Sequence, residues 1–81
     1  MKDKKFGKVA IVGLGLIGGS LAGALKKSGK VADDTGIDVD RGSIDYALRK
    51  KIIDHGYTSI GEGVSGAEVI VIATNVGNIV K

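Results

Sequence analysis

The sequence predicts a small α/β domain built on a parallel sheet, and three observations carry this prediction. Two uncharged runs rich in β-branched residues, 9–12 and 69–73, are typical of strands buried on both faces. Apolar residues recur at helical spacing in the segments between them. Predicted strands and helices alternate along the chain, and this alternation implies right-handed crossovers between parallel strands.

The composition bounds the class of protein. The chain has 81 residues, 43% of them hydrophobic, and a net charge of +3, which fits one small globular domain. No basic stripe is interleaved with aromatic residues, so we expect no nucleic-acid partner. Cysteine is absent, which excludes disulfides and thiolate metal sites and is compatible with the cytoplasmic location that we expect. We assign no chemistry to the single His55, predicted in a loop, and expect no metal site.

The first strand is predicted over residues 8–13, and the first helix over 16–28. Between them lies a Gly-x-Gly-x-x-Gly motif at Gly13, Gly15 and Gly18. Gly13 permits a tight turn, Gly15 lets the backbone approach a pyrophosphate, and Gly18 lets the helix pack closely on the strand. The free N–H groups of the first helical turn then face the phosphates. Strand, motif and helix in this order predict dinucleotide binding.

A short transmembrane helix is the alternative for the same stretch. Residues 9–25 carry no charge, and their glycines include the small-xxx-small spacing of a helix-packing face. The run is at the short end of the spanning range, however. Its five glycines and its β-branched first half also disfavour a helix. We therefore expect no membrane partner and no signal peptide.

A second strand is predicted over 35–39, after a polar connection through Asp33 and Asp34. Asp38, near its end, follows the last motif glycine at a distance of about 20 residues, as in dinucleotide-binding sites. A carboxylate there can accept hydrogen bonds from the adenosine ribose and repel a 2′-phosphate, which favours NAD over NADP. NADP stays an alternative cofactor because of Arg41, since an arginine just beyond this position can accommodate that phosphate. The alternative for Asp38 is a polar strand terminus.

The remaining elements complete one half of a doubly wound, Rossmann-like sheet. They are a helix over 41–51 with Asp40 as a candidate N-cap, a strand over 57–59, a weak helix over 60–66 with capping-box spacing at Ser59 and Glu62, a strand over 69–73, and a turn that starts another helix within 74–81. The expected strand order is 3-2-1-4. The switch point between strands one and four then places a ligand cleft above Gly15 and Thr74.

Four segments carry a family resemblance: GLGLIGGSLAGAL (13–25), GIDVD (36–40), ALRKKIID (47–54) and AEVIVIATNVGNI (67–79). Together they resemble the N-terminal half of the prephenate and arogenate dehydrogenases of tyrosine biosynthesis, over about residues 8–80. The paired Gly18 and Gly19, followed by Ser20 and Leu21, are the most specific part. The resemblance implies NAD(P)-dependent oxidation of the substrate's ring hydroxyl, with decarboxylation and aromatisation.

The resemblance also implies cofactor contacts at the matching positions. These are Gly13, Gly15, Gly18 and Asp38 for the cofactor, Leu14, Leu16 and Ile17 for the turn that meets the pyrophosphate, and Ala73 and Thr74 for the nicotinamide side. Two positions depart from the family pattern. Asn75 stands where the family usually has proline. Lys51 stands at a helix end that is often glycine, where a left-handed backbone costs another residue about 1 kcal/mol.

In the family, the catalytic histidine, the substrate-binding arginines and the helical dimerisation domain lie downstream of the matched region, and His55 does not match the catalytic position. We therefore expect residues 1–81 to form one truncated dinucleotide-binding domain that is inactive alone. The alternatives are a non-enzymatic nucleotide-binding or interaction module, and the Rossmann half of another NAD(P)-dependent dehydrogenase. We also expect self-association through the unprotected edge of the strand over 69–73.

Overall fold

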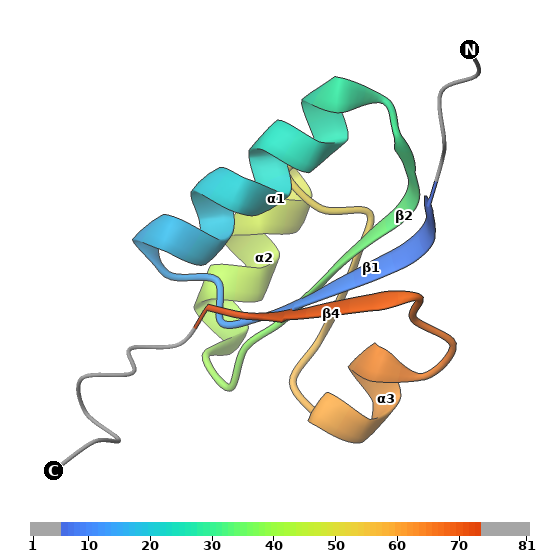
Figure 1. Ribbon diagram of the computed structural model, residues 1–81. Coiled ribbons are helices and arrows are strands. Elements are labelled where there is room, and N and C mark those ends of the chain that lie inside the picture. Colours follow the sequence, from blue (N-terminus) through green and yellow to red (C-terminus); the bar gives the residue numbers. More distant parts are fainter. Residues whose placement is uncertain (1–5, 74–81) are drawn as a thin grey trace, which may run out of the picture.

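The computed structural model describes residues 6–73, which form a four-stranded parallel sheet with helices on both faces (Figure 1). The strands lie in the order β3-β2-β1-β4, as the sequence predicts. Their bounds are β1 Phe6–Val12, β2 Val31–Ile37, β3 His55–Tyr57 and β4 Val69–Ile72. The helices are α1 Leu16–Ser28, α2 Arg41–Arg49 and α3 Ile60–Val64. Helices α1 and α2 cover one face, and α3 lies on the other.

The core lies between β1 and the two longer helices. Val9 and Ile11 point from β1 toward this side and are buried against Ala22 of α1 and Ile44 of α2. Residues that are paired in a parallel register share a face of the sheet, so Val69 and Val71 of β4 extend the same apolar layer. The amphipathic pattern of both helices is therefore satisfied by one shared core.

The opposite face is only partly covered within residues 6–73. Gly63 of α3 lies so close to Ile37 of β2 that only a residue without Cβ fits there. In β4, Ile70 and Ile72 alternate with the core residues and are 50% and 68% exposed. The prediction that this strand is buried on both faces is therefore wrong for the part of the chain described. The physical reason is that the five-residue α3 packs over the neighbouring strands and leaves these isoleucines uncovered.

Several strand bounds differ from the prediction because strand pairing outweighs local polarity. Asp33 and Asp34, predicted in a connection, lie within β2, where they pair with Lys8 and Val9 of β1. Strand β1 likewise begins earlier than expected, since Phe6 pairs with the start of β2 and its N–H donates to the Lys30 carbonyl at 2.8 Å. Strand β3 covers 55–57 and not 57–59. The second helix, the third helix and the fourth strand each end one or two residues before the predicted bound.

The helix ends test three of the predictions. Gly29 follows α1 with a φ of 72°, a left-handed conformation that suits glycine, and Asp40 caps α2 by accepting from the Gly42 N–H, as predicted. Lys51 has a φ of 59°, so this residue adopts the left-handed backbone considered for that position, which costs a non-glycine residue about 1 kcal/mol. The capping box at Ser59 does not form, because the Ser59 side chain makes no cap hydrogen bond.

Candidate cofactor site

The turn between β1 and α1 is fixed by its backbone. Gly13 has a φ of 100°, and its N–H donates to the Ile37 carbonyl of β2 at 2.7 Å. A Cβ on Gly18 would lie 1.8 Å from the Gly13 carbonyl oxygen, so the first turn of α1 packs directly on the motif. Gly15 has extended dihedrals that any residue adopts, and a Cβ there would meet no atom within 4 Å. The tight turn and the close packing agree with the expectation, and the space beside Gly15 is open.

A cavity of about 360 Å³ opens above the carboxyl ends of the strands. It lies where the strand order reverses between β1 and β4, which is the usual ligand position in an open α/β sheet. Its lining residues come from four separate parts of the chain: Val12, Gly13, Gly15, Ile37, Asp38, Val39, Thr58, Ile60 and Ala73. Val39 is an apolar side chain that is 89% exposed at the rim. The cavity therefore combines apolar walls with one carboxylate and the glycine turn.

A larger groove of about 760 Å³ runs between α1 and α2 and shares Gly15 with this cavity. It is lined mainly by small residues of α1, such as Gly19 and Gly23, and by the Tyr46 face of α2. We assign the site to the smaller cavity because the turn and the Asp38 carboxylate converge there, at the strand ends.

Asp38 follows β2 and directs its carboxylate to the glycine turn. One oxygen, Oδ2, accepts from the Leu14 N–H at 2.8 Å, and the other, Oδ1, accepts from the Asp40 N–H at 2.9 Å. A carboxylate oxygen has two acceptor positions, so each can still accept a hydroxyl donor. The residue thus stands at the cavity wall, as the sequence predicts, and also contacts the turn, which the sequence did not reveal.

The other predicted site residues are only partly brought together. Ala73 lines the cavity, and its N–H donates to the Val12 carbonyl at 2.8 Å. The side chains of Leu16 and Ile17 are exposed at the start of α1, and neither lines the cavity. Arg41 is held by an ion pair with Asp45, with Nε 3.4 Å from Oδ1. Thr74 and Asn75, and the turn and helix expected from 74 onward, lie outside the described residues.

Sequence reasoning missed the apolar walls of the cavity. Val39 and Ile60 are its most exposed apolar members. One signal was available for Val39, since it is an apolar residue placed just after the strand-end carboxylate. No local pattern indicates Ile60, because its position follows from how α3 crosses the sheet.

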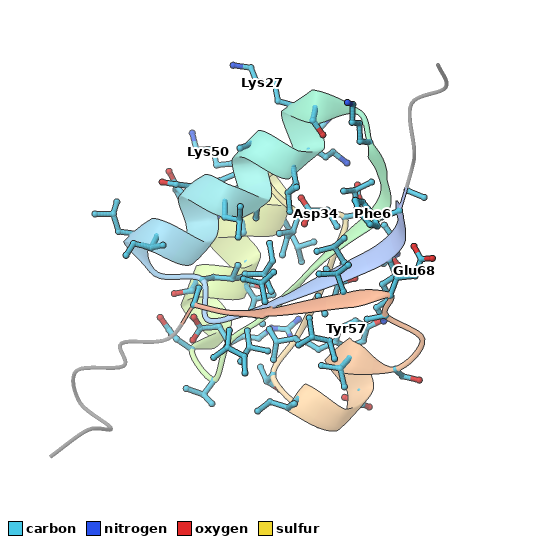
Figure 2. The ribbon with its side chains drawn as sticks, viewed as in Figure 1. Phe6, Lys27, Asp34, Lys50, Tyr57 and Glu68 are labelled. Carbon is cyan, nitrogen blue, oxygen red and sulfur yellow. The ribbon has the colours of Figure 1, made fainter. Side chains whose placement is uncertain are left out.

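Two neighbouring carboxylates of β2 have opposite environments on the two faces of the sheet. Asp34 is fully buried on the α1 side (Figure 2), and neither carboxylate oxygen has a hydrogen-bond partner among residues 6–73. Burial raises its pKa to about 6, although the Lys26 ammonium opposes the shift. For Asp33, burial acts in the same direction, but hydrogen bonds from His55 and Thr35 outweigh it and lower the pKa. His55 therefore lies in β3 beside a carboxylate, and not in the predicted loop.

Comparisons with known proteins support the resemblance seen in the sequence. A prephenate dehydrogenase of Bacillus subtilis (strain 168) is 40% identical over 76 residues, which are 94% of this chain and 19% of that protein. The crystal structure of prephenate dehydrogenase from A. aeolicus, in complex with hydroxyphenyl propionate and NAD+, matches with a TM-score of 0.85 and 33% identity. The chain is related to the prephenate dehydrogenases. The match covers 96% of this chain and 28% of the solved one, so the chain spans less than a third of either prephenate dehydrogenase.

A more distant match shows the fold alone. The apo scyllo-inositol dehydrogenase of Lactobacillus casei has a TM-score of 0.74 at 21% identity, over 95% of this chain and 23% of that chain. No family model matches the chain.

The membrane alternative for residues 9–25 does not hold, because this stretch is a strand, a turn and a helix. Among the described helices, none has both the length and the apolar character needed to cross a bilayer.

Proposed function

We propose that this chain is the NAD-binding domain of a prephenate dehydrogenase. The observation that carries the proposal is the cavity at the switch point of the sheet, where the glycine turn and the Asp38 carboxylate meet. The relatedness to prephenate dehydrogenases, one of them solved with NAD+, supports the choice of cofactor and enzyme class. In the whole enzyme the cofactor would accept a hydride as the substrate is oxidised and decarboxylated.

The start of α1 is suited to hold the pyrophosphate. The first N–H groups of a helix have no partner within the helix, and no side chain caps α1. Its first turn contains no acidic residue that would compete with an anion. Helix α2, by contrast, is capped by Asp40. The N–H groups beside Gly15 are therefore the ones that we assign to the phosphates, with the helix dipole adding to the attraction.

The ribose end of the site favours NAD over NADP. The Asp38 carboxylate would accept hydrogen bonds from the ribose hydroxyls and would repel a 2′-phosphate. The guanidinium of Arg41 makes only an exposed ion pair with Asp45 through Nε, so the preference for NAD rests on the Asp38 carboxylate. Calorimetric titration with both dinucleotides tests this assignment. Tighter binding of NADP, or no binding of either by the folded protein, would contradict it.

Gly15→Val is expected to weaken NAD binding and to leave the fold intact. The position is extended and open, so the protein accepts a side chain there, but the valine would occupy the space through which the pyrophosphate approaches. We expect NAD affinity to fall by at least about tenfold, as for a lost charge-assisted contact. Titration calorimetry and circular dichroism measure the two effects separately.

Lys50→Ala is the matched control for this experiment. Lys50 follows the last residue of α2 and projects away from the sheet in Figure 2. Its removal should leave NAD affinity unchanged. A Gly15→Val protein that is folded and binds NAD like the wild type would exclude the assigned turn.

We also propose that the chain self-associates through the outer edge of β4. In the described part of the chain, β4 pairs only with β1, and Ile70 and Ile72 expose apolar surface beside that free edge. Free edges and exposed apolar residues favour pairing with another chain. Light scattering should show a mass that rises with concentration, and Ile72→Lys should reduce this rise. A constant monomer mass would contradict the proposal.

The cytoplasmic location that we expect from the sequence stays a prediction.

A further inference from the structure

Two consecutive residues at the end of β2, Ile37 and Asp38, hold the glycine turn. The Ile37 carbonyl accepts from the Gly13 N–H at 2.7 Å, and the Asp38 carboxylate accepts from the Leu14 N–H at 2.8 Å. Asp38 is itself fixed, because its own N–H donates to the Tyr57 carbonyl of β3 at 3.1 Å. The turn is thus tied to the sheet by one backbone bond and one side-chain bond, and the side-chain bond involves a charged acceptor.

This arrangement commits the Leu14 N–H to Asp38. The Leu14 N–H is the donor between the first two motif glycines, and it is part of the turn that the family resemblance assigns to the pyrophosphate. Since it already has a charged partner at 2.8 Å, the phosphates are left with the N–H groups that follow it, at the start of α1. The other carboxylate oxygen restrains the start of the β2–α2 loop through the Asp40 N–H.

We infer that Asp38 is a positioning residue for the glycine turn in addition to being the acceptor for the adenosine ribose. One carboxylate then sets both the presentation of the phosphate-binding amides and the recognition of the sugar. This inference rests on the proposed function and deepens it. Its consequence is that removing the Asp38 charge to admit NADP also loosens the turn, so such a variant loses affinity for both dinucleotides.

Asp38→Asn separates the two roles because an amide cannot replace both acceptors. Its Oδ1 can accept from one of the two N–H groups, but its Nδ2 is then a donor that faces the other one. Asp40→Asn is the matched control. It removes the same charge two residues away, and asparagine is an equally good N-cap for α2. Any general effect of lost negative charge appears in both variants.

The decisive measurement uses NAD and an analogue whose adenosine ribose lacks the 2′- and 3′-hydroxyls. If Asp38 also positions the turn, Asp38→Asn weakens binding of the analogue by about tenfold or more, as expected for a lost hydrogen bond to a charged group. If Asp38 acts only on the ribose, the variant and the wild-type protein bind the analogue equally, and the inference is overturned. Asp40→Asn should bind both ligands as the wild type does.

Hydrogen exchange in the cofactor-free wild-type protein gives a second test that needs no variant. We expect the Leu14 amide to exchange at least about tenfold more slowly than the amides of Gly15 and Leu16, which lack this acceptor. Equal exchange of the three amides would overturn the inference. Failure of the proposed function has a different signature, since the wild-type protein would then bind neither NAD nor the analogue.

Discussion

Replacing Gly18 by alanine is expected to destabilise the domain by about 3 kcal/mol or more and to abolish NAD binding, because the added methyl group has no room. Its Cβ would lie 1.8 Å from the Gly13 carbonyl oxygen and 2.9 Å from the carbonyl carbon. These are backbone atoms that cannot rotate away as a side chain does. Either α1 lifts off the turn or the turn leaves β2, and both movements disrupt the phosphate-binding amides. Chemical denaturation and NAD titration measure the two losses.

Gly23→Ala provides the matched control within the same helix. A Cβ there meets only Ile52 Cγ2, at an ordinary 3.9 Å. Since alanine favours a helix by about 1 kcal/mol over glycine, this variant should be slightly more stable than the wild type and should bind NAD normally. A Gly18→Ala protein with wild-type stability and affinity would show that the helix does not pack on the turn in solution.

Asp34→Asn is expected to stabilise the domain at pH 7 by about 2 kcal/mol. The folded pKa of Asp34 is about 6 and the unfolded value is 3.8, so the folded state binds the extra proton between these pH values. Stability therefore falls as the pH rises from about 4 to about 6, and the full cost above pH 6 is about 3 kcal/mol. Asparagine removes the charge, although burying its amide still costs part of the free energy of burying an unpaired polar group.

The pH dependence provides the clearest measurement for Asp34. The wild-type protein should lose stability in urea between pH 4 and pH 6, and Asp34→Asn should not. The control is Asp33→Asn, because the pKa of Asp33 is lowered and this group loses its stabilising contribution only as the pH falls below 3.8. That variant should be destabilised at pH 7 and keep the decline between pH 4 and pH 6. Identical slopes in wild type and Asp34→Asn would contradict the assignment.

The elements with strong local signals were predictable from the sequence. Helix α1 has the predicted bounds, because apolar residues recur at helical spacing from Leu16 to Leu25 and Gly29 follows the last helical turn. The start of β2 was missed because Asp33 and Asp34 look like a loop, whereas pairing with β1 makes them strand residues. Their burial depends on partners far along the chain. No local pattern of the sequence contains that information.

For the candidate site, likewise, the residues of the motif were predictable from the sequence, and the contacts that depend on distant segments were not. The glycines and Asp38 stand where the motif places them, since their spacing reflects the length of one strand–helix–strand unit. The bond between Asp38 and Leu14, and the apolar wall at Ile60, follow from the three-dimensional path of the loops. The ion pair of Arg41 with Asp45 could have been predicted, because the two residues have i,i+4 spacing in the predicted helix.

The cavity walls come from segments as far apart as Val12 and Ala73, and these meet only when β4 has paired with β1. Contacts between such distant segments form late, since a long loop must close first. A dinucleotide in this cavity would therefore stabilise the complete sheet, and it would not stabilise a form in which β4 is unpaired. A higher cofactor concentration would then lower the fraction of molecules in which β4 is detached.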